Sequence, residues 1–445
     1  MRRVAVVGGG IAGLAAAYQL ASSTDDIEVV LHEAGDRVGG KLLTTPFAGR
    51  PVDEGADAFL ARVPWGIELC RELGIAGDLV SPAAGSAFVW SGGALRRLPA
   101  GLVLGVPTDL DALAASGIVD RSVTPRHGAR PLRADEDVAV GALVREQLGD
   151  QVLERLVDPL LGGINAGDAD RLSIRAAAPQ LAAAAERDAD LLAALRAQPS
   201  AAPGPVFFCP ALGMGALVDA LLAALAGAHV DIRLGSPVRA LDALDADALV
   251  IAVPADVAAS LLEHEAPKAA AGLAAIEYAS VALVTLAFPR EGIDHALDGS
   301  GYLVPRTEGL LLTAASWATT KWAHLAGNDG RVVVRASAGR AGEERIASMD
   351  DDQLVAQLLA DLELSMGARG EPDEVRVSRW PSGFPQYAPG HLDRIAQIEA
   401  ELALAVPRVA LAGAALRGIG VPACIREGRD AADRVLARAA GQRQG

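Results

Sequence analysis

The stretch VAVVGGGIAGL, at residues 4–14, decides the fold. Its opening run of small aliphatic residues is typical of a parallel strand that is buried on both faces. Gly8, Gly10 and Gly13 then fall in G-x-G-x-x-G spacing, which permits a tight turn, a close backbone approach to a pyrophosphate and close packing of the next helix on the strand. Residues 14–20 are strong helix formers, so a phosphate would lie at the amino end of a helix.

A second apolar run, residues 27–32, ends at Glu33. This acid follows the last glycine of the motif by about 20 residues, the position from which a carboxylate accepts both hydroxyls of a ribose. An ordinary glycine-rich turn between a strand and a helix would not require an acid there. The strand, the helix and Glu33 together predict a dinucleotide site.

The composition limits the class of protein. A chain of 445 residues is too long for one hydrophobic core, so we expect two or three domains. No apolar run reaches the roughly 18 residues that cross a bilayer, and Met1-Arg2-Arg3 leads directly into the first strand without room for a signal peptide. We therefore expect a cytoplasmic protein without a transmembrane segment, soluble or at most peripheral to the membrane. The net charge of −16 argues against nucleic acid and anionic membrane as partners.

The cysteines and histidines form no metal-binding pattern. Cys70, Cys209 and Cys424 are far apart and make neither a CxxC pair nor a disulfide framework. The seven histidines are scattered, without an HExxH motif or a ligand-like cluster. We expect no protein-bound metal.

A short basic turn follows the predicted ribose acid. Within residues 34–41, Gly39 and Gly40 let the backbone bend close to a ligand, and Arg37 and Lys41 can meet phosphate charge. This turn is similar to the R-x-G-G-[RK] segment of the flavin amine oxidase superfamily, which lies just after the ribose acid. The resemblance favours FAD over NAD as the cofactor.

Patterns along the middle of the chain predict further elements. Residues 90–99 predict a hairpin with a Gly-Gly turn, whose Arg96 and Arg97 lie either at an exposed edge or at an anion entrance. Residues 101–200 are helical in pattern, but residues 158–168 are too glycine-rich for continuous helix and predict a loop, a common place for a substrate contact.

The remaining patterns alternate between strands and helices. Residues 230–241 predict a strand, and the similar strand of FAD proteins passes the adenine. Residues 276–374 alternate as an antiparallel sheet would, with a helix over 351–366. Residues 409–440 predict a strand, a loop and a helix whose amino end can face a flavin.

The predicted fold class is α/β. It combines an FAD-binding Rossmann-like domain, of the glutathione reductase or amine oxidase type, with an α+β substrate domain and a helical insertion. We expect the FAD-binding domain to be discontinuous, over residues 1–90, 220–265 and 380–445. The helical insertion takes residues 91–200, and the substrate-binding domain, with its antiparallel sheet, takes residues 201–219 and 266–379.

Essentially the whole chain resembles one family, the bacterial protoporphyrinogen/coproporphyrinogen oxidases of haem synthesis. The nucleotide motifs are shared by the wider superfamily, and residues 53–60 and 93–101 also match. Three segments are more specific. Residues 163–173 are similar to G-[IV]-x-A-G-[DN]…L-S, residues 384–391 to P-Q-Y-x-x-G-H, and residues 418–425 to G-[IV]-x-[IV]-x-x-C-I.

The resemblance implies a chemistry. FAD accepts a hydride from a meso carbon of a porphyrinogen substrate while a pyrrole NH loses a proton, and three such transfers yield the aromatic porphyrin. O2 reoxidises the flavin and H2O2 is released. The alanine- and arginine-rich composition suggests a GC-rich genome and thereby the branch that uses coproporphyrinogen III. A transient hand-over of the product to a ferrochelatase, and a monomer or homodimer, complete the expected partners.

The resemblance also implies contacts, residue by residue. Because the flavin does the chemistry, no catalytic acid or base is expected. Gly163 and Asn165 of the predicted loop are candidate substrate contacts. Arg62 is the first candidate for a substrate carboxylate, with Arg96 and Arg97 behind it, although a solvated surface role is as well supported for each. The implied cofactor-binding residues are Gly8, Gly9, Gly10, Ile11, Ala12, Gly13, Glu33, Ala34, Arg37, Gly40, Lys41, Gly55, Ala56, Asp57, Ala58, Val238, Leu392, Gly413, Gly418, Ile419 and Gly420.

Two residues depart from the family pattern. Asn165 replaces an aromatic residue that is often found there, and Asp57 stands where some eukaryotic members carry a basic residue, so a substrate carboxylate must be met elsewhere. The alternatives are a protoporphyrinogen IX oxidase, another flavin amine oxidase-like enzyme such as a monoamine oxidase or carotenoid desaturase, and a non-catalytic porphyrin-binding protein that has lost FAD.

Overall fold

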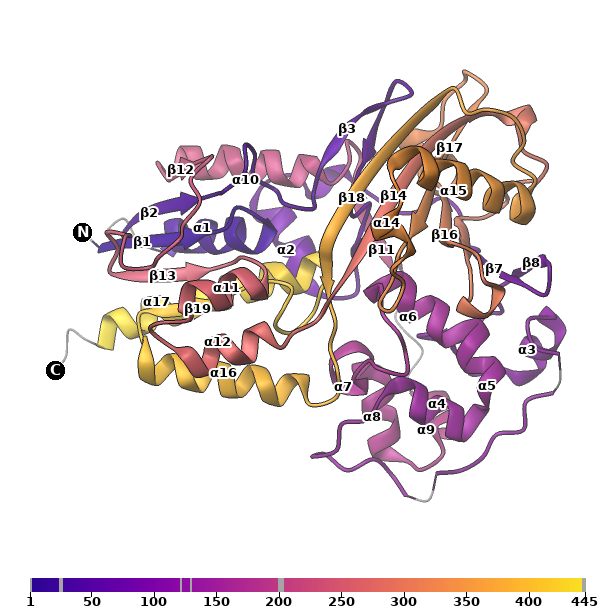
Figure 1. The fold of residues 1–445 in the computed structure, drawn as a ribbon, viewed down its shortest axis with the longest axis horizontal. Coiled ribbons are helices and arrows are strands. Elements are labelled where there is room, and N and C mark those ends of the chain that lie inside the picture. Colours follow the sequence, from indigo (N-terminus) through magenta and orange to yellow (C-terminus); the bar gives the residue numbers. More distant parts are fainter. Residues whose placement is uncertain (1, 24–26, 121, 129, 199–203, 442–445) are drawn as a thin grey trace.

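The computed structural model describes residues 2–23, 27–120, 122–128, 130–198 and 204–441. A parallel sheet with helices on both faces forms one side of the molecule, and a larger, mainly antiparallel sheet and a group of short helices form the other (Figure 1). This arrangement confirms the predicted α/β fold class. No helix in the described ranges combines the length and the apolar character that a bilayer span requires.

The parallel sheet carries the amino-terminal motif. Its strand order is β12-β2-β1-β13-β19, and every pairing is parallel. Side chains alternate between the faces, so that Val4 and Val6 enter the core on one side and Ala5 and Val7 enter the core on the other. The strands are β1 (Arg2–Val7), β2 (Ile27–His32), β12 (Asp231–Arg233), β13 (Ala248–Ile251) and β19 (Val409–Leu411).

Helices cover both faces of this sheet, which explains the uninterrupted apolar run in β1. The face of Val4 and Val6 packs against α1 (Ile11–Ser23), α2 (Pro64–Glu72), α10 (Gly215–Gly227) and α17 (Val421–Gly441). The opposite face packs against α11 (Ala255–Leu262), α12 (Pro267–Ala274) and α16 (His391–Ala405).

The second sheet has the order β18-β14-β17-β16-β15-β7-β8 and is antiparallel except where β15 pairs with β7. One face packs on α15 (Asp351–Met366) through residues such as Val334 and Ala336. The alternate residues Arg335 and Ser337 lie on the other face and line a cavity. The strands are β7 (Phe88–Ser91), β8 (Ala94–Arg97), β14 (Tyr278–Pro289), β15 (Gly301–Leu303), β16 (Leu312–Trp317), β17 (Arg331–Ala338) and β18 (Glu374–Pro385).

The helical unit has a hydrophobic cluster of its own, to which its helices contribute leucine, valine and alanine side chains. A π-helical turn, Leu153–Val157, directly joins the helix that ends at Val152 to the helix that begins at Asp158. The helices are α3 (Leu110–Ser116), α4 (Val140–Leu148), α5 (Asp150–Val152), α6 (Asp158–Asn165), α7 (Ile174–Ala177), α8 (Pro179–Arg187) and α9 (Leu191–Arg196).

Short elements complete the described chain. Two-stranded pairings join β3 to β4 and β9 to β10, and β11 lies between β5 and β6. Short helical turns also occur next to strands; for example, Arg290–Gly292 follows β14 and Ala318–Lys321 follows β16. These elements are β3 (Thr44–Phe47), β4 (Arg50–Asp53), β5 (Phe59–Leu60), β6 (Leu79–Val80), β9 (Leu102–Val103), β10 (Val106–Pro107), β11 (Phe207–Pro210), α13 (Ala318–Lys321) and α14 (Arg345–Ser348), with 3-10 turns at Ala76–Asp78, Arg290–Gly292, Arg306–Glu308 and Ala323–Leu325.

Two local predictions were wrong. Residues 158–165 form helix α6 rather than a loop, because packing of Leu161 into the helical unit outweighs the low helix propensity of the glycines. The predicted strand over 230–241 is confined to β12, since Gly235, with a φ of 57°, and Pro237 end it. The hairpin at residues 90–99 and the helix at 351–366 are present as predicted.

The division into domains stays a prediction, but packing places several segments differently from the predicted limits. Strands β7 and β18 lie across the limits at residues 90 and 380, and both belong to the seven-stranded sheet. Helix α12 and the start of α10 fall in the predicted substrate domain, yet they pack on the parallel sheet. Domain boundaries that are assigned from the sheet on which each element packs therefore differ from the boundaries predicted from the sequence.

Replacing Gly428 with alanine should destabilise the protein. Gly428 lies in α17, where an added methyl group would overlap the carbonyl oxygen of Ala12 in α1. Moving the two helices apart to relieve this overlap should cost roughly 1–3 kcal/mol. In thermal denaturation, G428A should therefore unfold several degrees below the wild type.

The same change in α10 serves as the control. No atom lies within 4 Å of a methyl group added at Gly227. G227A should keep or raise the unfolding temperature, because alanine lowers the entropy of the unfolded chain. An equal fall in the unfolding temperature of G428A and G227A would contradict a specific role for the α1–α17 contact.

Candidate functional site

The carboxyl edge of the parallel sheet brings together residues that are far apart in the sequence. Gly8 follows β1, Glu33 follows β2, Val238 lies beyond β12, and Gly413 lies beyond β19. All four line a single cavity of about 1600 Å³. Open parallel sheets bind ligands at this edge.

Three glycines shape the turn between β1 and α1. Gly8 has a φ of 104°, and a methyl group there would lie 2.6 Å from the carbonyl oxygen of Ala252. A methyl group on Gly13 would overlap the carbonyl oxygen of Gly8, so α1 packs directly on the turn. A methyl group added at Gly10, by contrast, would meet no other described part of the chain within 4 Å, apart from the adjacent residues and the backbone of α1. The turn thus leaves an open space at the amino end of α1, where backbone amides without helical acceptors can bind a phosphate.

Glu33 fixes this turn from the neighbouring strand. Its Oε2 accepts a hydrogen bond from the backbone amide of Gly9 at 2.7 Å, and its Oε1 accepts one from Gly35 at 2.7 Å. An ionised carboxylate has further lone pairs, so Glu33 can also accept from ribose hydroxyls. Gly9 and Gly13 are outside the cavity lining and act by shaping the turn.

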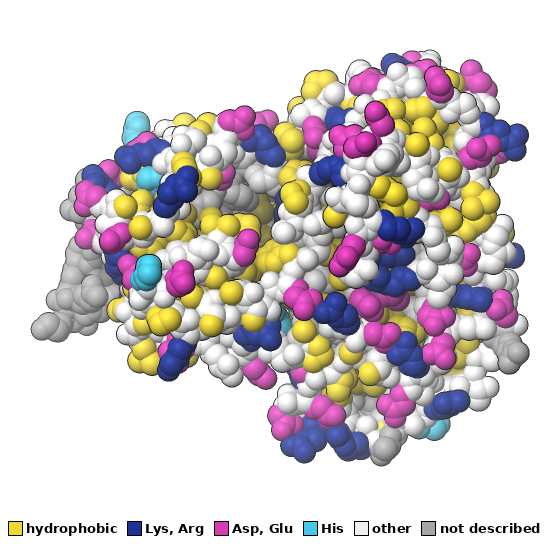
Figure 2. Space-filling view, viewed as in Figure 1, with side chains coloured by type: hydrophobic (Ala, Val, Ile, Leu, Met, Phe, Trp, Pro, Cys, Tyr) yellow, Lys and Arg dark blue, Asp and Glu magenta, His cyan; other side chains and the backbone are white. Residues whose placement is uncertain are grey.

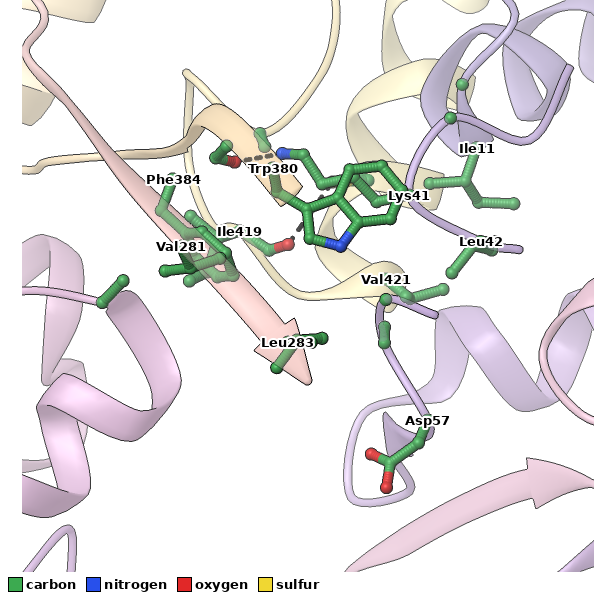
Figure 3. A pocket seen from close by; sticks show the side chains of 18 of the residues that line it. Ile11, Lys41, Leu42, Asp57, Val281, Leu283, Trp380, Phe384, Ile419 and Val421 are labelled. Atoms are coloured by element: carbon green, nitrogen blue, oxygen red, sulfur yellow. Dashed lines mark hydrogen bonds between the residues drawn. The ribbon is translucent and has the colours of Figure 1, made fainter. Parts of the chain in front are cut away.

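The basic turn is held mainly by its own backbone. Arg37 donates to the carbonyl oxygens of Val38 at 3.2 Å and Gly40 at 2.8 Å. Lys41 donates its ammonium to the carbonyl of Gly383 and lies 5.5 Å from the ring centroid of Phe384. Burial lowers the pKa of Lys41. Figure 3 shows Lys41 close to Trp380, whose direct cross-strand neighbour is Val281 of β14; Val281 and Leu283 line the same cavity.

The amino end of α17 reaches the same cavity. Ile419 and Val421 line it, whereas Gly418 and Gly420 are not among the lining residues. The hydroxyl of Tyr387 fixes this loop, because it donates to the carbonyl of Ala414 and accepts from the amide of Gly418 at 3.0 Å. The loop backbone is therefore held in place before any ligand binds.

Residues 386–391 join this loop to the helical unit. The Tyr387 ring stacks on His391, with 4.3 Å between the ring centroids, and its carbonyl accepts from the amide of Ser173 at 2.7 Å. Gln386 donates its amide to the carbonyl of Asn165 at 3.0 Å. The sequence indicated only that this segment matches a family; the structure gives its physical role as a junction of three parts of the fold.

The carboxyl end of α6 forms the wall facing the parallel sheet. Gly163 and Ile164 line the cavity there. Asn165 does not, because its side chain is buried and donates to the carbonyl of Leu161 at 3.1 Å. Leu392, the second residue of α16, is also outside the lining.

The arginines favoured by the sequence lie away from the cavity. Arg62 is exposed, and Arg97 pairs with Asp298 and lies over the ring of Phe88. Arg96 packs beside Gly117. None of the three lines the cavity.

Two other cations, Lys321 and Arg335, line the cavity instead. Sequence reasoning missed both. Arg335 interrupts the apolar strand run at residues 331–338, and a charged residue inside such a run is the signal that could have revealed it, since charged side chains are rarely buried unless paired.

The cavity fits an FAD and a second ligand. Its volume of about 1600 Å³ exceeds the roughly 300–1,000 Å³ of a typical single-ligand pocket. The glycine turn and Glu33 form a cradle for the nucleotide end, and Lys41, residues 55–58 and Ile419 continue the lining toward β14 and α6. The individual cofactor contacts that the family resemblance implies stay predictions.

Replacing Glu33 with glutamine should weaken FAD binding. The amide group would place a donor against the amide of Gly9 or Gly35 and would remove an acceptor for ribose. Loss of a charged hydrogen bond costs about 1.5–3 kcal/mol, so E33Q should bind FAD roughly 10- to 100-fold more weakly in a titration of the cofactor-free protein. E28Q is the control, because Glu28 lies on the same strand and pairs with Arg3 at the surface. Equal affinities for E33Q and wild type would contradict the assigned role.

Replacing Tyr387 with phenylalanine should loosen the loop before α17. The amide of Gly418 and the carbonyl of Ala414 would lose their shared partner, and FAD affinity should fall about tenfold together with the unfolding temperature. Y302F is the matched control, because the buried hydroxyl of Tyr302 bonds Ser365 at 2.6 Å outside the cavity. Y302F should lower the unfolding temperature alone; the same loss of FAD affinity in both variants would refute a specific role of Tyr387.

Comparisons with known proteins agree with this site. The model of the flavin containing amine oxidoreductase family matches residues 11–436. The chain is 38% identical over 441 residues to the coproporphyrinogen III oxidase of Mycobacterium tuberculosis (strain ATCC 25618 / H37Rv), covering 95% of each chain. It is 31% identical over 467 residues to the coproporphyrinogen III oxidase of Bacillus subtilis (strain 168), covering 98% of each. A crystal structure from Exiguobacterium sp. 255-15 has a TM-score of 0.85 at 30% identity, covering 98% of both chains.

The glycine turn, the acid after β2, the two-ligand cavity and these near full-length matches lead to one assignment. The chain belongs to the flavin-containing amine oxidoreductases and, within them, to the coproporphyrinogen III/protoporphyrinogen oxidase family, with FAD as its cofactor.

Proposed function

We propose that this protein catalyses the FAD- and O2-dependent oxidation of coproporphyrinogen III to coproporphyrin III in haem synthesis. The observation that carries the proposal is 38% identity over 95% of both chains to an enzyme named for this substrate. The cavity supports it, because its volume of about 1600 Å³ leaves room for a large second ligand beside the cofactor. Bound FAD would supply the acceptor for the three hydrides of the six-electron reaction.

The chain itself would bind and orient the substrate. Val281 and Leu283 of β14 and Ile164 of α6 contribute apolar side chains to the cavity lining, which would suit a flat macrocycle. Trp380 donates its ring NH to the carbonyl of Glu54 at 3.0 Å, which fixes the indole in the wall. These walls would exclude water from the reacting carbon.

No proton acceptor stands out in the part of the described cavity that faces β14 and α6. Its carboxyl group, Asp57, accepts hydrogen bonds from Lys321 and Trp322 and pairs with Arg335. Burial alone would raise the pKa of Asp57, but the two cations outweigh it and hold the pKa well below its usual range. Asp57 therefore stays ionised and paired, and we assign it no acid–base role.

The further partners belong to the same proposal. We propose O2 as the electron acceptor, a transient hand-over of coproporphyrin to a ferrochelatase, and a monomer or homodimer located in the cytoplasm. A measurement of native mass tests the oligomeric state. Retention of porphyrin by the protein during gel filtration tests how readily the product is released.

The activity has a direct test. The purified protein should show the absorbance bands of oxidised flavin and should produce porphyrin fluorescence from coproporphyrinogen III under air faster than the autoxidation blank. Turnover of protoporphyrinogen IX should be slower. Turnover by E33Q should be slow and should recover when FAD is added in excess. This recovery would show that the porphyrin fluorescence depends on the cofactor site.

Two results would contradict the proposal. A faster reaction with protoporphyrinogen IX would assign the other substrate of the family. Bound flavin without turnover of either porphyrinogen would leave the fold in place and direct the search to amines and other substrates of this superfamily.

A further inference from the structure

Three charged side chains from distant parts of the chain meet in the cavity. The Oδ2 atom of Asp57 lies 2.8 Å from the ammonium of Lys321 and 3.1 Å from Nη1 of Arg335. The ring NH of Trp322 donates to the same oxygen at 3.2 Å. One carboxylate oxygen therefore accepts two hydrogen bonds and also pairs with Arg335. Figure 3 shows the Asp57 carboxylate in the lower right of the view, below the level of Leu283.

This cluster lies in a poorly solvated part of the cavity wall, where the side chains of Lys321, Arg335 and Asp57 are only 18%, 8% and 22% exposed. Both cations pair with Asp57, and the buried carboxyl of Asp53 also interacts with Arg335. Charge in a poorly solvated wall is costly unless a counter-charge compensates it. An anionic group of a ligand would supply further counter-charge.

Lys321 also has donors to spare. An ammonium has three N–H groups, and within the described chain one of them is used by Asp57. Lys321 lies at the end of α13, 5.2 Å from the ring centroid of Trp322, and lines the cavity. Arg335 is more committed, because it also donates to the carbonyl of Gly55, although its Nε has no acceptor. Lys321 is thus the group best able to bind a ligand, and Arg335 supports it.

Hydroxyl groups lie beside Arg335. Ser316 of β16 is the direct cross-strand neighbour of Arg335, and Ser337 lies two residues farther along β17 on the same face. Both serines line the cavity. A carboxylate bound near Arg335 would find these hydroxyl donors beside it.

The other basic residues are placed differently. Lys41 is already bonded to Gly383, and Arg62 and Arg97 lie outside the cavity. On the face that Figure 2 shows, basic and acidic side chains are interspersed over the surface. Lys321 and Arg335 therefore place two cations in the cavity wall of a chain whose net charge is −16.

We propose that Lys321, supported by Arg335, binds a propionate carboxylate of the tetrapyrrole substrate. Asp57 is a positioning residue that holds both cations at the cavity wall, where Lys321 keeps free N–H donors for a ligand. The inference rests on the proposed function, because the propionate groups are those of the proposed substrate.

Binding of the stable product tests this inference without turnover. The FAD-loaded wild type, K321Q, K321R and K268Q are titrated with coproporphyrin III and with its uncharged tetramethyl ester in one detergent-containing buffer, and porphyrin fluorescence is recorded. K321Q should bind the tetracarboxylate roughly 10- to 100-fold more weakly, because it loses a charge-assisted contact, and should bind the ester as the wild type does. K321R should stay within about threefold of the wild type for both ligands.

Lys268 supplies the matched control. It is an exposed lysine that pairs with Glu401 at 3.4 Å, far from the cavity lining. K268Q should bind both porphyrins like the wild type. Flavin absorbance should be the same in all four proteins, since Lys321 is assigned to the substrate rather than to FAD.

Several outcomes would overturn the inference. They are an unchanged affinity of K321Q for coproporphyrin III, an equal loss for acid and ester, and a loss of flavin from K321Q alone. The test is separable from the proposed activity. A wild type that turns over coproporphyrinogen III while K321Q binds normally refutes the carboxylate site alone, whereas the predicted binding difference without turnover refutes the activity alone.

Discussion

The close packing of α1 on the turn after β1 and on α17 is the constraint on which the rest of the structure depends. Gly13 allows the helix to pack on the turn after β1, and Gly428 allows α17 to pack against the backbone of Ala12. Because no side chain separates these elements, the amino ends of two helices reach one cavity. Both ends present backbone amides, which favour negative charge on a bound ligand. The glycines therefore fix the geometry of the cofactor site by steric exclusion.

A second junction connects this site to the substrate side. The segment at residues 386–391 bonds the loop before α17 through Tyr387 and the end of α6 through Gln386. The helical unit is thereby tied to the cofactor loop by directed hydrogen bonds in addition to apolar packing. This explains in physical terms why a short polar segment marks the family more specifically than the nucleotide motif does, since its bonds depend on one arrangement of three parts.

The electrostatics of the cavity differ along its length. The nucleotide end is built from glycines, backbone amides and the acceptor Glu33. The opposite end holds Asp57 with two cations, in walls that are otherwise apolar or hydroxylic. An acidic chain thus places two cations in the wall of its cavity. The strength of such contacts rises as water is excluded from around them.

The sequence by itself determined the elements whose signals are local. The G-x-G-x-x-G turn, the acid after β2, the hairpin at residues 90–99 and the helix at 351–366 follow from spacing, turn chemistry and capping within a few residues. The candidate cofactor residues next to these signals mostly line the cavity for the same reason. Tertiary structure decided that residues 158–165 are helical, that Asn165 faces inward, and that Lys321 meets Asp57 across 264 positions of sequence. Such contacts leave no periodic or spacing signal, because they arise only when two sheets and a helical unit pack around one cavity.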